Sequence, residues 1–123
     1  MSKTVLYNNE DYFNQVSKQI SLLNNEIDKI DEISRNIFEA NKNNKKILVA
    51  GNGGSCADAE HFVGELVCTF SDRNRGALSA LNLSSNNAAL SAWANDFNFE
   101  SFIKRQVLAH GKSGDILILI STG

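Results

Sequence analysis

Apolar residues recur at every third or fourth position through the amino-terminal part of the chain. The run begins at Phe13 and ends at Ile37. This spacing keeps one face of an α-helix apolar, so it predicts helix over residues 9–43, with a bend or break at Asn24-Asn25. A stripe of this length has to be buried against the sheet of the same domain or against another copy of the chain. We expect both, and therefore a homo-oligomer.

The rest of the chain alternates short β-prone runs with helical spacing. Strands are expected at residues 46–50, 77–83 and 115–120, and helices at residues 56–70, 87–94 and 99–110. Strands that alternate with helices are typical of a parallel sheet with helices on both faces, so the fold class is α/β. Ligands of such sheets bind beyond the carboxyl ends of the strands.

The length of 123 residues is enough for one domain. We divide it into a helical oligomerisation region, residues 9–43, and the first strands and helices of the sheet core, residues 44–123. The last expected strand runs directly into Ser121-Thr122-Gly123, and nothing follows to cover the sheet. We therefore expect a single domain that is incomplete at its carboxyl end.

Composition narrows the function classes. Hydrophobic residues make up 42% and charged residues 21% of the chain, as in ordinary soluble domains. The net charge of -2 offers no basic surface for nucleic acid. The sequence contains neither a long apolar run typical of a membrane span nor a signal-peptide core at its start, so we expect a cytoplasmic protein without a membrane partner. Cys56 and Cys68 fall in one expected helix, roughly 18 Å apart, too far for a disulfide.

The strongest local motif is Gly51-Asn52-Gly53-Gly54-Ser55, which lies between an expected strand and an expected helix. Glycines at such a turn let backbone N–H groups approach an anionic or hydroxyl-rich ligand at the helix amino terminus. The spacing matches neither the dinucleotide fingerprint nor the P-loop. A tight turn with Ser55 as helix cap is the alternative interpretation.

The helix after this loop carries polar side chains on one face. His61 and Glu65 are four residues apart, and Asp58 precedes them by one turn. The face is either simply solvated or functional, and we expect it to open toward the glycine loop. A functional face would hold a carboxylate base oriented by an imidazole, or two ligands of a divalent metal that needs further ligands from elsewhere.

Two further polar pairs lie where sheet ends are expected. Asn95-Asp96 falls between two helical stretches, and Ser121-Thr122 follows the third strand. Each pair alone is a common turn or cap sequence, but together with the glycine loop they indicate three loops converging on one edge of the sheet. His110 is expected to contact the negative end of its helix, and Trp93 to lie in a core or interface.

Taken in order, these motifs resemble the sugar-isomerase (SIS) domain, and more narrowly the phosphoheptose isomerase family. The specific combination is the glycine loop followed by Asp58, His61-Phe62 and Glu65-Leu66, together with the Asn95-Asp96-Phe97 and Ser121-Thr122 loops. The resemblance implies a flavodoxin-like sandwich with a long amino-terminal helical region. It also implies a homotetramer that interconverts sedoheptulose 7-phosphate and D-glycero-D-manno-heptose 7-phosphate, which supplies heptose for bacterial surface polysaccharide.

The resemblance carries site roles onto residues of this chain. Ser121 and Thr122 would hold the phosphate. Glu65 would move the proton between C1 and C2 through an enediol and, with His61, would bind zinc in those members that contain it. The full set of implied substrate contacts is Asn52, Gly53, Gly54, Ser55, Glu65, Asn95, Asp96, Ser121 and Thr122.

The chain departs from the family pattern at three positions. Thr69 stands where family members often have Arg, Asn86 where they often have Asp, and Gly123 where a serine usually continues the phosphate loop. The carboxyl-terminal helix that brings a further His and a Gln to the family's site is not in this sequence, so the remaining zinc ligands are expected from a missing segment.

Two alternatives stay open at the level of sequence. The first is another phosphosugar aldose-ketose isomerase of the same fold, acting on a sugar of different length. The second is a non-catalytic SIS-domain binding protein that regulates replication initiation. Such relatives lack the helix carboxylate, so the presence of Glu65 favours an enzyme.

Overall fold

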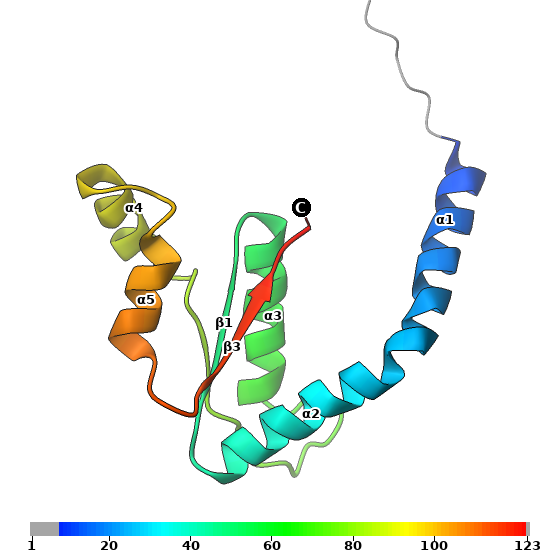
Figure 1. Ribbon diagram of the computed structural model, residues 1–123, viewed down its shortest axis with the longest axis horizontal. Helices are drawn as coiled ribbons and strands as arrows, with labels where there is room; N and C mark the ends of the chain where they lie inside the picture. Colours follow the sequence, from blue (N-terminus) through cyan, green and yellow to red (C-terminus); the bar gives the residue numbers. More distant parts are fainter. Residues whose placement is uncertain (1–7, 123) are drawn as a thin grey trace, which may run out of the picture. The chain divides into compact units, whose positions relative to one another are not determined.

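The computed structural model describes residues 8–122 and has the expected α/β organisation (Figure 1). Contacts divide the chain into two compact units, with the boundary between Asn36 and Ile37. In chain order the elements are α1 (Asn9–Leu22), η1 (Leu23–Glu26), α2 (Ile27–Lys42), β1 (Ile47–Gly51), α3 (Gly54–Val67), β2 (Ala80–Asn82), α4 (Asn87–Asp96), α5 (Phe102–His110) and β3 (Ile116–Ile120).

The amino-terminal unit is helical throughout its described part. Helix α1 begins at a side-chain cap, where the Asn8 carboxamide oxygen accepts a hydrogen bond of 3.0 Å from the backbone N–H of Glu10. The 3₁₀ segment η1 contains Asn24 and Asn25, so the expected break lies where the sequence indicated. Most of the apolar stripe is exposed in the single chain, with Ile20 61% and Ile33 54% accessible, whereas Ile37 at its end packs against an apolar core cluster.

The sheet is parallel and has the strand order β2-β1-β3. Strand β1 lies in the middle, and Ile47 through Ala50 are buried on both faces, as an uninterrupted apolar run predicts. At the carboxyl end Gly51 pairs with Ile120 of β3, and on the other side Val49 pairs with Asn82 of β2. The loops that follow these strands therefore leave the sheet at one edge.

Each face of β1 belongs to its own apolar cluster. Ile47 and Val49 pack with Ala59 of α3 and with Ala40 near the end of α2. Leu48 and Ala50 pack with Leu83, and α5 covers this second cluster through partly buried apolar residues, Ile103 and Val107. Helices thus lie on both faces of the sheet, which confirms the expected fold class.

Several expected boundaries were wrong. Helix α3 begins at Gly54, not residue 56, and ends at Val67 because the backbone leaves the helical conformation at Cys68, whose φ is -83° and ψ -126°. Strand β2 is confined to Ala80–Asn82, since Leu78 is held by α3 through a 3.1 Å hydrogen bond from its N–H to the Leu66 carbonyl. Helix α4 extends through Asp96, and α5 begins at Phe102.

Two further expectations concern single residues. Ser55 is not the cap of α3; Gly53 occupies that position, and Ser55 is buried in the first turn. Cys68 is the residue just after α3, and both cysteines are free thiols. Gly123 lies outside the described residues. No helix within residues 8–122 combines the length and apolar character that crossing a bilayer requires.

Candidate functional site

The glycine loop joins β1 to α3 in a conformation that its sequence requires. Gly53 has φ 56° and ψ -124°, a backbone conformation that L residues with a Cβ rarely adopt. A Cβ on Gly51 would lie 2.4 Å from the carbonyl oxygen of Ser55, because the loop folds back onto the first turn of the helix. Cβ atoms on Gly53 and Gly54 would meet nothing within 4 Å. The loop is therefore closely packed against the first turn of α3 at Gly51, whereas at Gly53 and Gly54 it borders open space.

A second loop holds the glycine loop in place. The backbone N–H of Gly51 donates to the Ser84 hydroxyl at 3.1 Å, and the N–H of Ser84 donates to the carboxamide oxygen of Asn82 at 2.9 Å. Both Ser84 and Asn82 are buried. Sequence reasoning missed this support. The available signal was the polar run Ser84-Ser85-Asn86 directly after a β-prone segment, at the same sheet edge as the glycine loop.

The structure brings two of the three predicted loops to one cavity. The cavity has a volume of about 380 Å³, and its polar lining comes from Asn52 and Ser55 on one side and Ser121 and Thr122 on the other. The pairing of Gly51 with Ile120 explains this meeting, because the residues after each strand emerge next to one another. Hydroxyl and amide groups facing a helix amino terminus make this cavity suited to an anionic ligand.

A second cavity of about 280 Å³ adjoins the first on the side of β2. Gly51, Asn52 and Ile103 line both cavities, so the glycine loop forms the wall between them. Cys56 and Ser84 contribute to the second cavity, together with apolar side chains of α4, α5 and the segment between them. We call Ser121-Thr122 the hydroxyl loop. A ligand bound by the hydroxyl loop can extend across Asn52 into this space.

The predicted pair on α3 is formed. His61 Nε2 lies 3.3 Å from Glu65 Oε1, and the two side chains are 78% and 40% exposed. Glu65 lines a third cavity of about 320 Å³, together with Phe62, Leu66 and residues of the following loop. It does not line either cavity at the glycine loop. Glu65 is eleven positions further along the helix than Gly54, a rise of about 16 Å, so within one chain its carboxylate does not reach the glycine loop.

The expected zinc site can be compared with the His, Cys, Asp and Glu side chains of the described residues. Within residues 8–122 no group of three or more His, Cys, Asp or Glu side chains gathers around a common point. His61 and Glu65 supply a nitrogen and an oxygen on one accessible helix face, which suits two positions of a tetrahedral zinc site. Such a site needs further ligands beyond these two.

Asn95 and Asp96 are placed differently from the expectation. They form the last turn of α4 rather than a free loop, and the Asn95 carboxamide donates to the Asp96 carboxylate at 3.1 Å. Both are exposed, and neither lines the two cavities at the glycine loop. The helix continues through them because the backbone N–H of Phe97 still bonds to the Trp93 carbonyl at 2.9 Å.

Trp93 connects α4 to α5 through its indole ring. The ring stacks on Phe97 with 4.2 Å between centroids, and its N–H donates to the Ser101 hydroxyl at 2.9 Å. The guanidinium of Arg105 lies 5.0 Å above the indole. These contacts give the partly buried Trp93 a packing role between α4 and α5, although it belongs to neither of the two core clusters.

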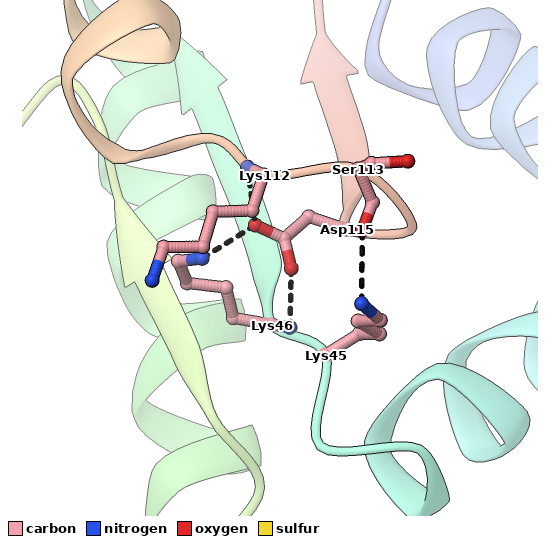
Figure 2. A network of polar contacts seen from close by, with 5 residues as sticks. All are labelled: Lys45, Lys46, Lys112, Ser113 and Asp115. Carbon is pink, nitrogen blue, oxygen red and sulfur yellow. Dashed lines mark hydrogen bonds and ion pairs between the residues drawn. The ribbon is translucent and has the colours of Figure 1, made fainter.

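The most perturbed acid of the described chain lies at the opposite end of the sheet. Figure 2 shows Asp115 accepting hydrogen bonds from the backbone N–H groups of Lys46, at 3.0 Å, and Lys112, at 2.8 Å, and pairing with the Lys46 ammonium. The hydrogen bonds from Lys46 lower the pKa of Asp115 to about 2. Nearby, the Lys45 ammonium donates to the Ser113 carbonyl at 2.9 Å. This network joins the amino ends of β1 and β3 and is structural.

The fold and cavities define a class of protein before any comparison. It is an α/β protein that presents a glycine loop and a hydroxyl loop beyond the carboxyl ends of parallel strands, where such sheets bind ligands. The family model of the SIS domain matches residues 11–123, and the chain belongs to this family.

Relatives within the family carry one recurrent name. The chain is 48% identical over 86 residues to a phosphoheptose isomerase of Bordetella avium, covering 70% of this chain and 43% of the relative. It is 43% identical over 96 residues to a phosphoheptose isomerase of Clostridium acetobutylicum, covering 78% of this chain and 48% of the relative. The chain thus spans about half the length of these curated relatives.

Solved structures show the same likeness. The structure of a phosphoheptose isomerase from Neisseria gonorrhoeae superposes with a TM-score of 0.74 at 32% identity, over 94% of this chain and 61% of that one. A phosphoheptose isomerase from Francisella tularensis gives a TM-score of 0.75 at 29% identity, over 95% of this chain and 63% of that one. The phosphoheptose isomerase resemblance seen in the sequence is confirmed.

Proposed function

We propose that this protein interconverts sedoheptulose 7-phosphate and D-glycero-D-manno-heptose 7-phosphate, in the cytoplasm, as an aldose-ketose isomerase that supplies heptose for surface polysaccharide. The observation that carries the proposal is the cavity shared by Asn52, Ser55, Ser121 and Thr122. The names of the relatives support the choice of a seven-carbon substrate.

The phosphate end of the substrate fits the cavity between the two loops. Ser121 and Thr122 supply hydroxyls, and the amino terminus of α3 supplies backbone N–H groups and a partial positive charge. Helix α3 has no side-chain hydrogen bond at its cap, Gly53, which keeps this terminus available to a ligand. Asn52, Gly53 and Gly54 would then contact the sugar hydroxyls next to the phosphate.

Isomerisation between a ketose and an aldose moves one proton between two carbons. A base removes a proton from C1 of the ketose while the C2 carbonyl oxygen takes up a proton, which gives the enediol. The proton then returns at C2, the C1 hydroxyl gives up its proton, and C1 becomes the carbonyl. Glu65 is proposed as this base, because a carboxylate can both take and return the proton and its neighbour His61 can orient it. Asn95 and Asp96 are proposed as further substrate contacts.

His61 and Glu65 are also proposed as zinc ligands, with the remaining ligands coming from the segment beyond this sequence. A bound zinc ion would act as a Lewis acid on the substrate's carbonyl and hydroxyl oxygens. The side chains of this chain would hold the ion on the accessible face of α3, where the two donor atoms lie 3.3 Å apart.

The separation of Glu65 from the hydroxyl loop within one chain suggests how subunits share an active site. Because Glu65 lines a different cavity from Ser121 and Thr122, one subunit's carboxylate is best able to serve a phosphate held by another subunit. We propose a homotetramer whose active sites combine residues of neighbouring copies. The exposed apolar stripe of α1 and α2 supports such association, since it is left uncovered in the single chain.

The test is a product assay with the full-length protein and a panel of phosphosugars. Sedoheptulose 7-phosphate should be converted to the heptose 7-phosphate, detected by NMR of the anomeric protons. Pentose and hexose phosphates serve as comparison substrates. Faster turnover of a pentose or hexose phosphate would identify that sugar phosphate as the substrate instead. Binding of a sugar phosphate without turnover of any of them would favour a binding protein.

A further inference from the structure

The loop between α3 and β2 folds an arginine back onto the helix that carries Glu65. A turn at Asp72 starts this reversal: the Asn74 N–H donates to the Asp72 carboxylate at 2.9 Å, and the Arg75 N–H donates to the Asp72 carbonyl at 3.2 Å. The turn directs the half-buried Arg75 side chain toward the carboxyl end of α3.

The guanidinium of Arg75 binds four backbone carbonyl oxygens. One terminal nitrogen donates to Leu66 at 3.0 Å and to Gly76 at 2.8 Å. The other donates to Glu65 at 2.6 Å and to Cys68 at 3.1 Å. Three of the four acceptors belong to the last turn of α3 or to the residue that ends it, so one side chain holds three carbonyls at the end of the helix.

The Arg75 guanidinium supplies hydrogen-bond donors and positive charge that the carboxyl end of α3 otherwise lacks. The last carbonyls of a helix lack intrahelical partners and carry a partial negative charge. Helix α3 has no basic residue in its own last turn, so the positive charge comes from the loop instead. Only a planar fork with several donors can reach carbonyls on two sides at once, whereas a lysine ammonium places its donors on one atom.

The contacts of Arg75 with α3 also fix the position of the Glu65 side chain. The Glu65 carbonyl accepts the shortest of the four bonds, while the Glu65 carboxylate lies beside His61. Arg75 also lines the cavity that Glu65 lines. Fixing the backbone at Glu65 fixes the origin of its side chain, on which the position of a general base depends.

We propose that Arg75 is a positioning residue for Glu65: it holds the last turn of α3 so that the carboxylate meets the substrate carbon at reacting distance. This role rests on the proposed isomerase function. It extends that function to a loop residue that contacts neither the glycine loop nor the hydroxyl loop in the described chain.

The test compares Arg75→Lys with Arg73→Lys in the full-length protein. Arg73 lies in the same loop and is exposed, so its replacement controls for a lost guanidinium at this part of the surface. For Arg75→Lys we expect kcat to fall between about tenfold and a hundredfold, the scale of a reacting group displaced by about 1 Å, with KM within about threefold. Arg73→Lys should match the wild type.

A double substitution separates positioning from general stability. If Arg75 acts through Glu65, adding Arg75→Lys to Glu65→Gln should cost no further kcat, because the group being positioned is already gone. A purely structural role would lower kcat by the same factor in both backgrounds, and that result overturns the proposal. If Arg75→Lys does not fold, Arg75→Gln is judged by the same two criteria.

The outcomes also distinguish this inference from the function beneath it. If Glu65→Gln abolishes turnover while Arg75→Lys leaves kcat unchanged, the positioning role is wrong and the isomerase stands. If the wild type isomerises no sugar phosphate, the proposed function is wrong, and the role assigned to Arg75 is overturned with it.

Discussion

Lys46 and Asp115 join the amino ends of β1 and β3 through both a backbone hydrogen bond and an ion pair (Figure 2). The Lys46 side chain is 25% exposed and that of Asp115 only 5%. The pair lies at the end of the sheet opposite the two cavities at the glycine loop, so its effects on stability can be measured separately from phosphate binding there.

The first prediction is an acid-dependent loss of stability at Asp115. Its pKa is lowered from 3.8 to about 2 in the folded state, mainly by the side-chain and backbone hydrogen bonds from Lys46. A depressed pKa stabilises the fold fully above the unfolded value and progressively less as pH falls from about 4 toward 2. Urea unfolding should therefore show wild type and Asp115→Asn well separated at pH 6 and converging near pH 2.

The size of that separation follows from hydrogen bonds to a charged group, so Asp115→Asn should cost about 1–3 kcal/mol at pH 6. Glu100→Gln, which neutralises an exposed carboxylate, is the matched control and should leave the midpoint nearly unchanged. A gap between wild type and Asp115→Asn that stays constant from pH 6 to pH 2 would contradict the assignment.

The second prediction concerns the glycine loop. Gly51→Ala places a Cβ 2.4 Å from the Ser55 carbonyl oxygen, so the first turn of α3 has to move. We expect affinity for inorganic phosphate and substrate to fall by at least about tenfold, because the helix amino terminus shifts away from the hydroxyl loop. Calorimetric titration measures both affinities.

Gly76→Ala is the control for Gly51→Ala, since a Cβ at Gly76 meets no atom within 4 Å. Its binding affinity should equal that of the wild type. Equal affinities in all three proteins would remove the glycine loop from the binding site.

The third prediction is catalytic. Glu65→Gln keeps the shape of the side chain and removes the base, so turnover of sedoheptulose 7-phosphate should fall by at least about a hundredfold. Glu60→Gln, on the same helix and exposed, should retain normal turnover. Substrate affinity should change far less than turnover, because Ser121 and Thr122 line another cavity. Near-normal turnover by Glu65→Gln would favour the binding-protein alternative.

Subunit mixing tests whether Glu65 serves a neighbouring copy. Glu65→Gln and a Ser121→Ala, Thr122→Ala double variant should each be inactive alone. Refolded together they should regain measurable turnover, since some mixed sites contain both wild-type halves. If mixing restores nothing while each variant assembles normally, each site belongs to one chain.

The fourth prediction is metal binding by the full-length protein. About one zinc per subunit is expected, with tetrahedral nitrogen and oxygen ligation. His61→Ala should lose most of the metal by elemental analysis, whereas His110→Ala, at the end of α5, should keep it. Unchanged activity after exhaustive chelation, with no zinc detected, would exclude the metal role.

The fifth prediction is oligomeric. Ile30 and Ile33 lie on the apolar stripe of α2 and are 45% and 54% exposed in the single chain. Replacing Ile30 by Asp should weaken association, because a buried charge without a partner is costly. Asn25→Asp, outside the stripe, is the control. Light scattering should give a tetramer for wild type and control; a wild-type monomer at micromolar concentration would rule the prediction out.

Much of the fold could be predicted because the relevant signals are local. The 3,4 spacing from Phe13 to Ile37 and the uninterrupted apolar run of Ile47 through Ala50 each specify an element without reference to distant residues. The glycine loop was recognisable for the same reason, since its glycines lie next to one another in the chain.

Element boundaries were less predictable, because tertiary contacts set them. Strand β2 is short because Leu78 bonds to α3 instead of to β1, and α4 runs through Asp96 although Asn and Asp usually favour turns. The end of β2 depends on a partner in another element, and the end of α4 depends on a helix hydrogen bond that residue propensity alone does not predict.

The sequence by itself determined the α/β class, the glycine loop and the pairing of His61 with Glu65, since each depends on residues within a few positions of one another. The convergence of the glycine loop and Ser121-Thr122 on one sheet edge was also expected from the sequence. Only the tertiary structure decided that Asn95 and Asp96 lie outside their shared cavity, that Ser84 supports Gly51, and that Arg75 holds the end of α3. The reason is that strand register and loop reversal bring together groups far apart in the chain, as with the backbone N–H of Gly51 and the Ser84 hydroxyl, and no local pattern encodes such contacts.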